Sequence, residues 1–146
     1  MSVRVDMGLL VLRIAVGCIM FVHGAQKLLG WFGGLGFVGF TGWMASIHVP
    51  IVAAWLAILT EFFGGIALVL GFGARLAAFA IAVEMLVAIR LVHLHVGFFM
   101  NWNSVPNRGE GWEYTFLVFA AALTLALAGP GRLALGVRRG RGGGAA

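Results

Sequence analysis

Four ionisable residues lie inside long apolar stretches of this sequence, and their spacing points to chemistry within a membrane. They are Arg13, Glu61, Glu84 and Arg90. A charge at the centre of a spanning helix costs on the order of 3 kcal/mol or more, so such residues face the protein interior or water and pair with one another. We therefore expect the two arginines to meet the two glutamates. The residues alone leave two interpretations open: pairs that only fix the helix register, or a polar cavity that handles a proton or a ligand.

The end of the first apolar stretch adds two more polar side chains. Gly24 and Lys27 fall on the same helical face as Arg13, with His23 at the edge of that face. The candidate ligand-binding or proton-handling residues are therefore Arg13, His23, Lys27, Glu61, Glu84 and Arg90. The sequence assigns no catalytic residue and leaves open whether the chain is an enzyme.

The sequence predicts no metal site. His93 and His95 are two residues apart on a predicted helix, so their side chains point about 200° apart and cannot bind one ion together. A metal or haem ligand pair would need His23 as the partner. No H-E-x-x-H pattern occurs. Cys18 is the only cysteine, which excludes an internal disulfide and a cysteine-rich metal centre within one copy of the chain.

The composition places these residues in membrane-spanning helices. Of 146 residues, 62% are apolar and 10% are charged, and the mean hydropathy is +1.03, whereas soluble domains carry about 25% charged residues. Apolar runs without strand-like alternation cover residues 8–29, 50–70, 75–99 and 114–129. Because a span needs roughly 20 such residues, the sequence predicts an all-α membrane protein, a four-transmembrane-helix bundle formed by residues 1–132.

The basic residues set the predicted orientation. One side of the predicted bundle carries Arg4, Arg75, Arg132, Arg138, Arg139 and Arg141, and the other carries only Lys27 and Arg108. The excess of positive charge predicts that the N and C termini of this multi-pass membrane protein are cytoplasmic. The Gly/Arg-rich tail, residues 133–146, is predicted to be disordered.

The outer side is expected to be aromatic, and nucleic acid is not an expected partner. Trp31, Trp43, Trp55, Trp102 and Trp112 all fall on or near that side. They fit an interfacial belt or a mouth over a site for a flat apolar ligand. The isoelectric point is 11.2, but the basic residues form no stripe interleaved with aromatics. Glycine-rich residues 30–49 carry no formal charge and are expected to lie in the interface as a connection.

Three segments resemble the DoxX family of small bacterial membrane proteins. The first contains Arg13, Gly17, His23, Gly24, Gln26, Lys27, Leu28 and Gly30. The second contains Glu61, Gly64, Gly65, Leu68, Gly71 and Arg75, and the third is Gly129, Pro130, Gly131 and Arg132. Where the family commonly has a serine and an aspartate after this third motif, the sequence has Ala134 and Gly136.

The resemblance implies a four-helix inner-membrane subunit of a quinone-linked or redox-protective oxidoreductase assembly. In that function Glu61 or Glu84 would relay a proton, and His23 with Lys27 would hydrogen-bond a quinone carbonyl. No residue carries electrons, so a quinone or a redox partner subunit would have to. Two alternatives stay open: a non-catalytic scaffold or accessory subunit docked on a larger complex, and a small-solute or proton transporter that works as a homo-oligomer.

Overall fold

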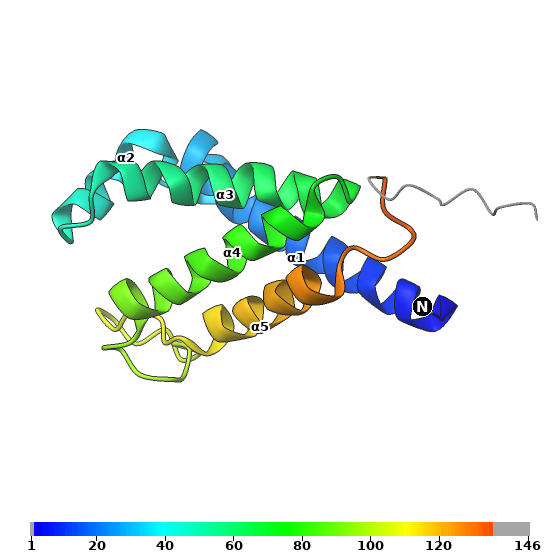
Figure 1. The fold of residues 1–146 in the computed structure, drawn as a ribbon. Coiled ribbons are helices and arrows are strands. Elements are labelled where there is room, and N and C mark those ends of the chain that lie inside the picture. Colours follow the sequence, from blue (N-terminus) through cyan, green and yellow to red (C-terminus); the bar gives the residue numbers. More distant parts are fainter. Residues whose placement is uncertain (1, 136–146) are drawn as a thin grey trace, which may run out of the picture.

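The computed structural model describes residues 2–135, and these residues form helices and connections without a strand (Figure 1). The helices are α1 (Val3–Leu29), the short helix η1 (Trp31–Gly33), α2 (Gly36–Ser46), α3 (Ile51–Leu70), α4 (Ala74–Ala88), the π-helical turn η2 (Ile89–His93) and α5 (Glu113–Ala128). The predicted tail beyond residue 135 lies outside the described residues.

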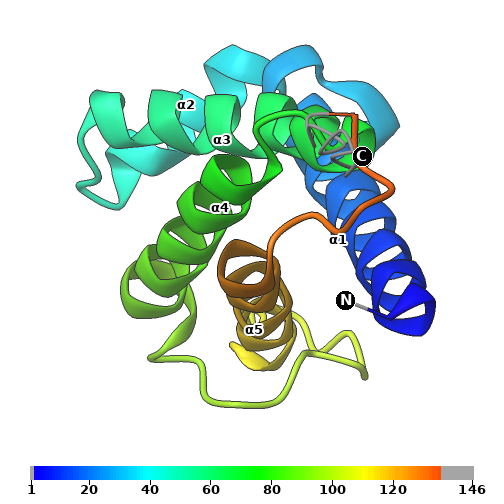
Figure 2. The same cartoon turned by 45° about the vertical axis from the view of Figure 1, so that its right-hand side comes forward.

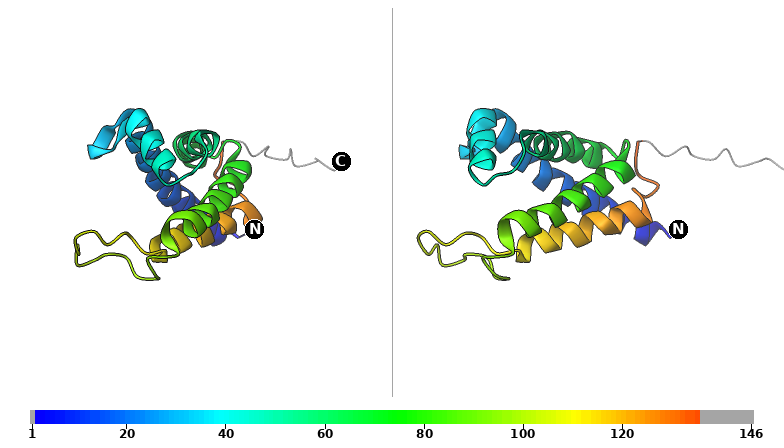
Figure 3. Two further views of the ribbon diagram at one scale, coloured as in Figure 1. Left: turned by 90° about the vertical axis from the view of Figure 1, so that its left-hand side faces the viewer. Right: turned by 60° about the vertical axis from the view of Figure 1, so that its left-hand side comes forward.

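The connections gather at two ends of the helix bundle (Figure 1). The start of α1, the turn 71–73 and the segment 129–135 lie at one end, which we call the N-terminal end. Residues 30–50 and 94–112 lie at the other, which we call the loop end; Figure 3 shows the connection 94–112 extending away from the helices. In Figure 2 α4 lies between α3 and α5, and α1 packs along α3.

Three helical segments are long and apolar enough to cross a membrane. They are α1, α3 and the continuous helix formed by α4 and η2. At 1.5 Å per residue, the 20 residues of α3 extend about 30 Å, which matches a hydrocarbon core. The 16 residues of α5 extend about 24 Å, and α5 packs along α4. The helical class is confirmed, while four crossings and cytoplasmic termini remain predictions.

Glycines bring α1 and α3 into close contact. A Cβ atom added at Gly24 would lie 2.4 Å from the backbone nitrogen of Phe62. One added at Gly65 would lie 2.5 Å from the backbone nitrogen of Phe21. Because real Cβ atoms do not come this near to backbone, these glycines are required for the contact.

Residues 30–49 contain a helix that the sequence prediction missed. It is α2, and its side chains Phe40 and Met44 are buried together with Ala54 and Ile58 of α3. The first half of α3 is therefore covered by α2, while α1 covers the second half. The glycines and aromatic residues of this stretch show no clear helical period, so the sequence predicts an interfacial connection here instead of a helix.

The C-terminal segment, residues 129–135, crosses the N-terminal end of the bundle from α5 to α3 (Figure 1). The backbone nitrogen of Arg132 donates to Oδ1 of buried Asp6 at 2.9 Å. The backbone nitrogen of Leu135 donates to the carbonyl oxygen of Leu70. Residues 133–135 of the predicted tail therefore pack against the helices, and Ala134 is buried.

Candidate functional site

An ion pair between Lys27 and Glu61 forms the centre of the polar interior. The Nζ atom of Lys27, near the end of α1, donates to Oε1 of Glu61, at the middle of α3. The side chain of Glu61 is 5% exposed and that of Lys27 is 24% exposed. The Lys27 ammonium also lies 5.0 Å from the centre of the Phe40 ring of α2, an arrangement that adds a cation–π attraction.

A second carboxyl group faces this pair from α4. Glu84 lies close enough to Glu61 and Lys27 to interact electrostatically with both. Its Oε2 atom and the Oε2 atom of Glu61 are both buried and have no hydrogen-bond partner among the described residues. One ammonium group therefore lies beside two carboxyl groups, and no donor within residues 2–135 bonds to the two Oε2 atoms.

Two rings complete this arrangement between α1 and α5. The rings of His23 and Tyr114 lie 6.1 Å apart, and both are within electrostatic reach of Glu61. His23 keeps an exposed surface. We call the five residues His23, Lys27, Glu61, Glu84 and Tyr114 the polar cluster; they come from α1, α3, α4 and α5.

The structure does not bring Arg13 or Arg90 to the polar cluster. Arg13 is 2% exposed and lies at the N-terminal end, where its Nη2 atom donates to the carbonyl oxygen of Leu133 at 3.2 Å. Its Nε and Nη1 atoms have no partner among the described residues. Arg90 is exposed on η2. The expected pairing of these arginines with the glutamates is therefore wrong. Lys27 forms the ion pair with Glu61, and Arg13 lies fourteen residues before Lys27 on α1, a distance of about 21 Å along the helix.

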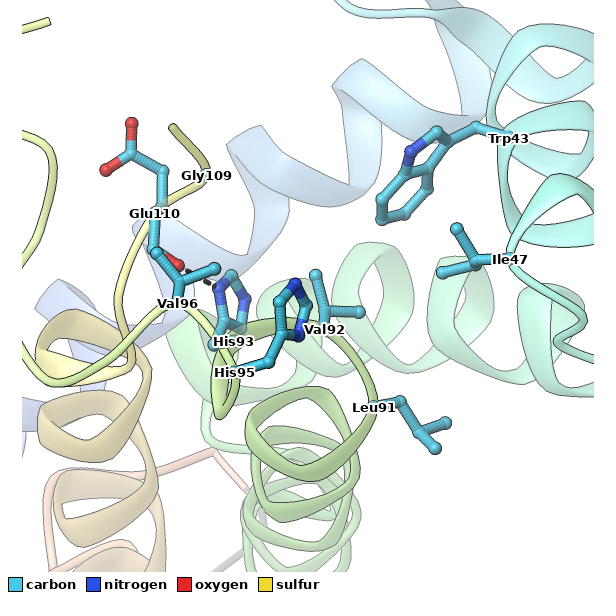
Figure 4. A pocket seen from close by; sticks show the side chains of 9 residues that line it. All are labelled: Trp43, Ile47, Leu91, Val92, His93, His95, Val96, Gly109 and Glu110. Carbon is cyan, nitrogen blue, oxygen red and sulfur yellow. Dashed lines mark hydrogen bonds between the residues drawn. The ribbon is translucent and has the colours of Figure 1, made fainter. Parts of the chain in front are cut away.

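A separate pocket opens at the loop end between α2 and the end of η2 (Figure 4). It has a volume of about 430 Å³ and is lined by Trp43, Ile47, Leu91, Val92, His93, His95, Val96, Gly109 and Glu110. We call it the outer pocket. Its lining is almost entirely apolar apart from the two imidazoles and the chain at Glu110.

His93 and His95 both line the outer pocket. The predicted span 75–99 ends instead at His93, and residues 94–96 form turns. Within residues 2–135 no group of three or more His, Cys, Asp or Glu side chains is arranged to hold a metal ion.

Tyr114 and Glu110 are site residues that the sequence did not single out as such. Tyr114 is the only tyrosine of the chain and begins the fourth apolar run, which was a usable signal. Glu110 contributes its backbone carbonyl, an atom that every residue has, so its side-chain type carried no signal.

Comparisons with known proteins show the family of the chain. The DoxX family model matches residues 8–94, which include the ion pair and Glu84. The chain belongs to the DoxX family. This DoxX protein is 30% identical over 135 residues to "Putative oxidoreductase CatD" of Bacillus subtilis (strain 168), covering 92% of this chain and 89% of that protein. It is 32% identical over 130 residues to "Inner membrane protein YphA" of Escherichia coli (strain K12), covering 87% and 86% of the two chains.

No solved structure matches the chain. Family membership and the three long apolar helices make this DoxX protein a multi-pass bacterial membrane protein in contact with lipid.

Proposed function

We propose that this DoxX protein is an inner-membrane subunit of an oxidoreductase assembly, and that its polar cluster exchanges a proton with a quinone-like head group. The observation that carries the proposal is the pair of buried carboxyl oxygens on Glu61 and Glu84 that have no hydrogen-bond partner in the part of the chain that the structure describes. The names of the two relatives, one an oxidoreductase and one an inner membrane protein, support the assembly and its location.

The charges of the polar cluster favour a single bound proton. With both glutamates ionised, one ammonium and two carboxylates carry a net charge of −1 inside the membrane. One proton held between Glu61 and Glu84 makes the group neutral, and the low dielectric of the membrane favours that state. The same proton provides a donor for the unpartnered oxygens.

A quinone needs this type of chemistry. Reduction of a quinone to its hydroquinone takes up two electrons and two protons, one proton on each oxygen. Lys27 is a hydrogen-bond donor for a carbonyl oxygen, the Glu61–Glu84 pair supplies one of the protons, and water supplies the second proton to the other oxygen. The electrons come from a redox partner subunit, since no side chain of the polar cluster carries them.

Infrared difference spectroscopy on the purified chain in nanodiscs tests this proposal. We expect a C=O stretch of a protonated carboxylic acid that shifts in D₂O, changes when menadione is added, and disappears in Glu84→Gln. Arg108→Gln, in an exposed loop position, is the control and keeps both signals. The proposal is overturned if the spectrum of the wild type lacks the protonated carboxyl band. It is also overturned if menadione does not change this band and Glu61→Gln does not change the affinity for menadione.

A further inference from the structure

The outer pocket carries a binding function of its own, and its argument does not rest on the proposed proton exchange. Its volume of about 430 Å³ lies in the range of small-molecule sites, roughly 300–1,000 Å³. Apolar side chains dominate its lining, with a few polar groups at one edge (Figure 4). This combination is typical of pockets that bind a small molecule and orient it by a few polar groups.

The chain at the edge of the pocket is held in a fixed conformation. Oε2 of Glu110 accepts a hydrogen bond from the backbone nitrogen of Asn101 at 2.8 Å. The side chain of Asn101 in turn bonds to the backbone of Val105 and Arg108. The loop that carries Glu110 is therefore organised by its own hydrogen bonds, and the pocket wall is formed before any ligand arrives.

The hydrogen bond of His93 fixes which of its nitrogens can act on a ligand. Nδ1 of His93 lies 2.8 Å from the backbone carbonyl oxygen of Glu110 (Figure 4). A carbonyl oxygen only accepts, so Nδ1 carries the hydrogen and donates. In the neutral ring Nε2 is then an acceptor, and it has no hydrogen-bond partner within residues 2–135. The pocket thus offers an acceptor at its polar edge.

The opposite wall supplies an aromatic surface. The indole of Trp43 and the side chain of Ile47 come from α2, and Val92 lies on η2 next to His93 (Figure 4). The ring centroids of Trp43 and Phe40 are 5.9 Å apart. Phe40 is buried against α3, so the indole of Trp43 packs on a buried side chain. A flat ring between these walls gains stacking and apolar burial.

We infer that the outer pocket binds an aromatic hydroxyl compound, a phenol or hydroquinone, whose O–H group donates to Nε2 of His93. A ring that lacks a donor leaves this acceptor without a partner on burial, and the loss of that bond weakens its binding. The acceptor at His93 therefore selects hydroxylated rings over ethers of the same shape.

Two probes of the same ring separate this binding from partition into lipid. They are 2-naphthol and 2-methoxynaphthalene, measured by equilibrium dialysis against the full chain in nanodiscs, with empty nanodiscs subtracted. We expect saturable binding of one 2-naphthol per chain. His93→Phe should weaken it about tenfold, the effect of one hydrogen bond, and change 2-methoxynaphthalene binding by less than about twofold.

A pair of tryptophan variants tests the position of the ligand. Trp43→Leu should weaken 2-naphthol binding several-fold, whereas Trp55→Leu, on α3 and outside the pocket, should leave it unchanged. If His93→Phe does not fold, Val92→Trp tests the same pocket by filling it, and it should abolish binding. The inference is overturned if 2-naphthol binds no better than to empty nanodiscs, if His93→Phe weakens both probes equally, or if Val92→Trp or Trp43→Leu has no effect beyond that of Trp55→Leu.

Discussion

Replacing Lys27 by methionine tests the central ion pair more directly than any other substitution. Lys27 supplies the cation of the polar cluster, and its partner Glu61 is 5% exposed. Methionine keeps the length and much of the apolar stem of the lysine side chain but removes its charge. The change therefore removes the ionic contact with Glu61 and the cation–π attraction to Phe40 together, while it keeps most of the apolar side chain.

The expected loss follows from the charges that remain. Breaking a buried ion pair from one side costs about 3–5 kcal/mol because a buried charge is left without its partner. Lys27 is 24% exposed, so we expect the lower end, about 3 kcal/mol of the free energy of unfolding. Glu61→Gln should cost less, about 1.5 kcal/mol, because Glu84 still lies near the ammonium group.

The double variant Lys27→Met/Glu61→Gln completes a thermodynamic cycle. It leaves no unpaired ion at either position, so its loss should be smaller than the two single losses taken together by about 2 kcal/mol. Unfolding with increasing SDS in mixed micelles, followed by tryptophan fluorescence and by helical circular dichroism, measures these differences.

Arg108→Met is the matched control, since it removes a cation from an exposed loop position. It should change the free energy of unfolding by no more than about 0.5 kcal/mol. If Lys27→Met loses no more than this control, or if the two single losses add in the double variant, Lys27 and Glu61 do not form the buried pair described above and the reasoning fails.

Three further substitutions address packing and the N-terminal end of the bundle, each measured by the same unfolding assay. Gly65→Ala should lose about 2 kcal/mol through the clash with α1, while Gly8→Ala, which meets nothing within 4 Å, should be neutral or slightly stabilising; equal effects would contradict the close contact. Arg13→Met should range from no change to a gain of about 2 kcal/mol, because it removes a buried charge of which two nitrogens have no partner within residues 2–135; a large loss would show that Arg13 has an acidic partner. Asp6→Ala should lose about 2 kcal/mol through the bond to Arg132, and Asp6→Asn clearly less, since it keeps an oxygen acceptor; equal losses would indicate that this bond contributes little.

The sequence determined the class of the protein because membrane insertion depends on local properties. Long apolar runs predict helices of membrane-spanning length, and the structure has them at α1, α3 and α4 with η2. Because a charge that faces lipid costs free energy, the sequence predicts that Glu61 and Glu84 face the protein interior, whatever the arrangement of the helices. Gly24 and Gly65 could also be identified from the sequence as packing residues, because small residues in spanning helices allow the backbones to approach closely.

Only the tertiary structure decided which of these residues meet. The register between α1 and α3, fixed where Gly24 and Gly65 contact the facing backbone, brings Lys27 to Glu61 and leaves Arg13 at the other end of the bundle. Periodicity gives the face of a helix but not its tilt or its register against another helix, so a charged residue's partner cannot be read from spacing alone.

The outer pocket was hidden from the sequence for a related reason. It exists because the helix ends at His93 and because α2 folds back along α3, and neither event has a strong local signal. The acceptor role of His93 depends on a backbone carbonyl seventeen residues away. Side-chain identity is written in the sequence, but the proton position on an imidazole is set by the neighbour that the fold provides.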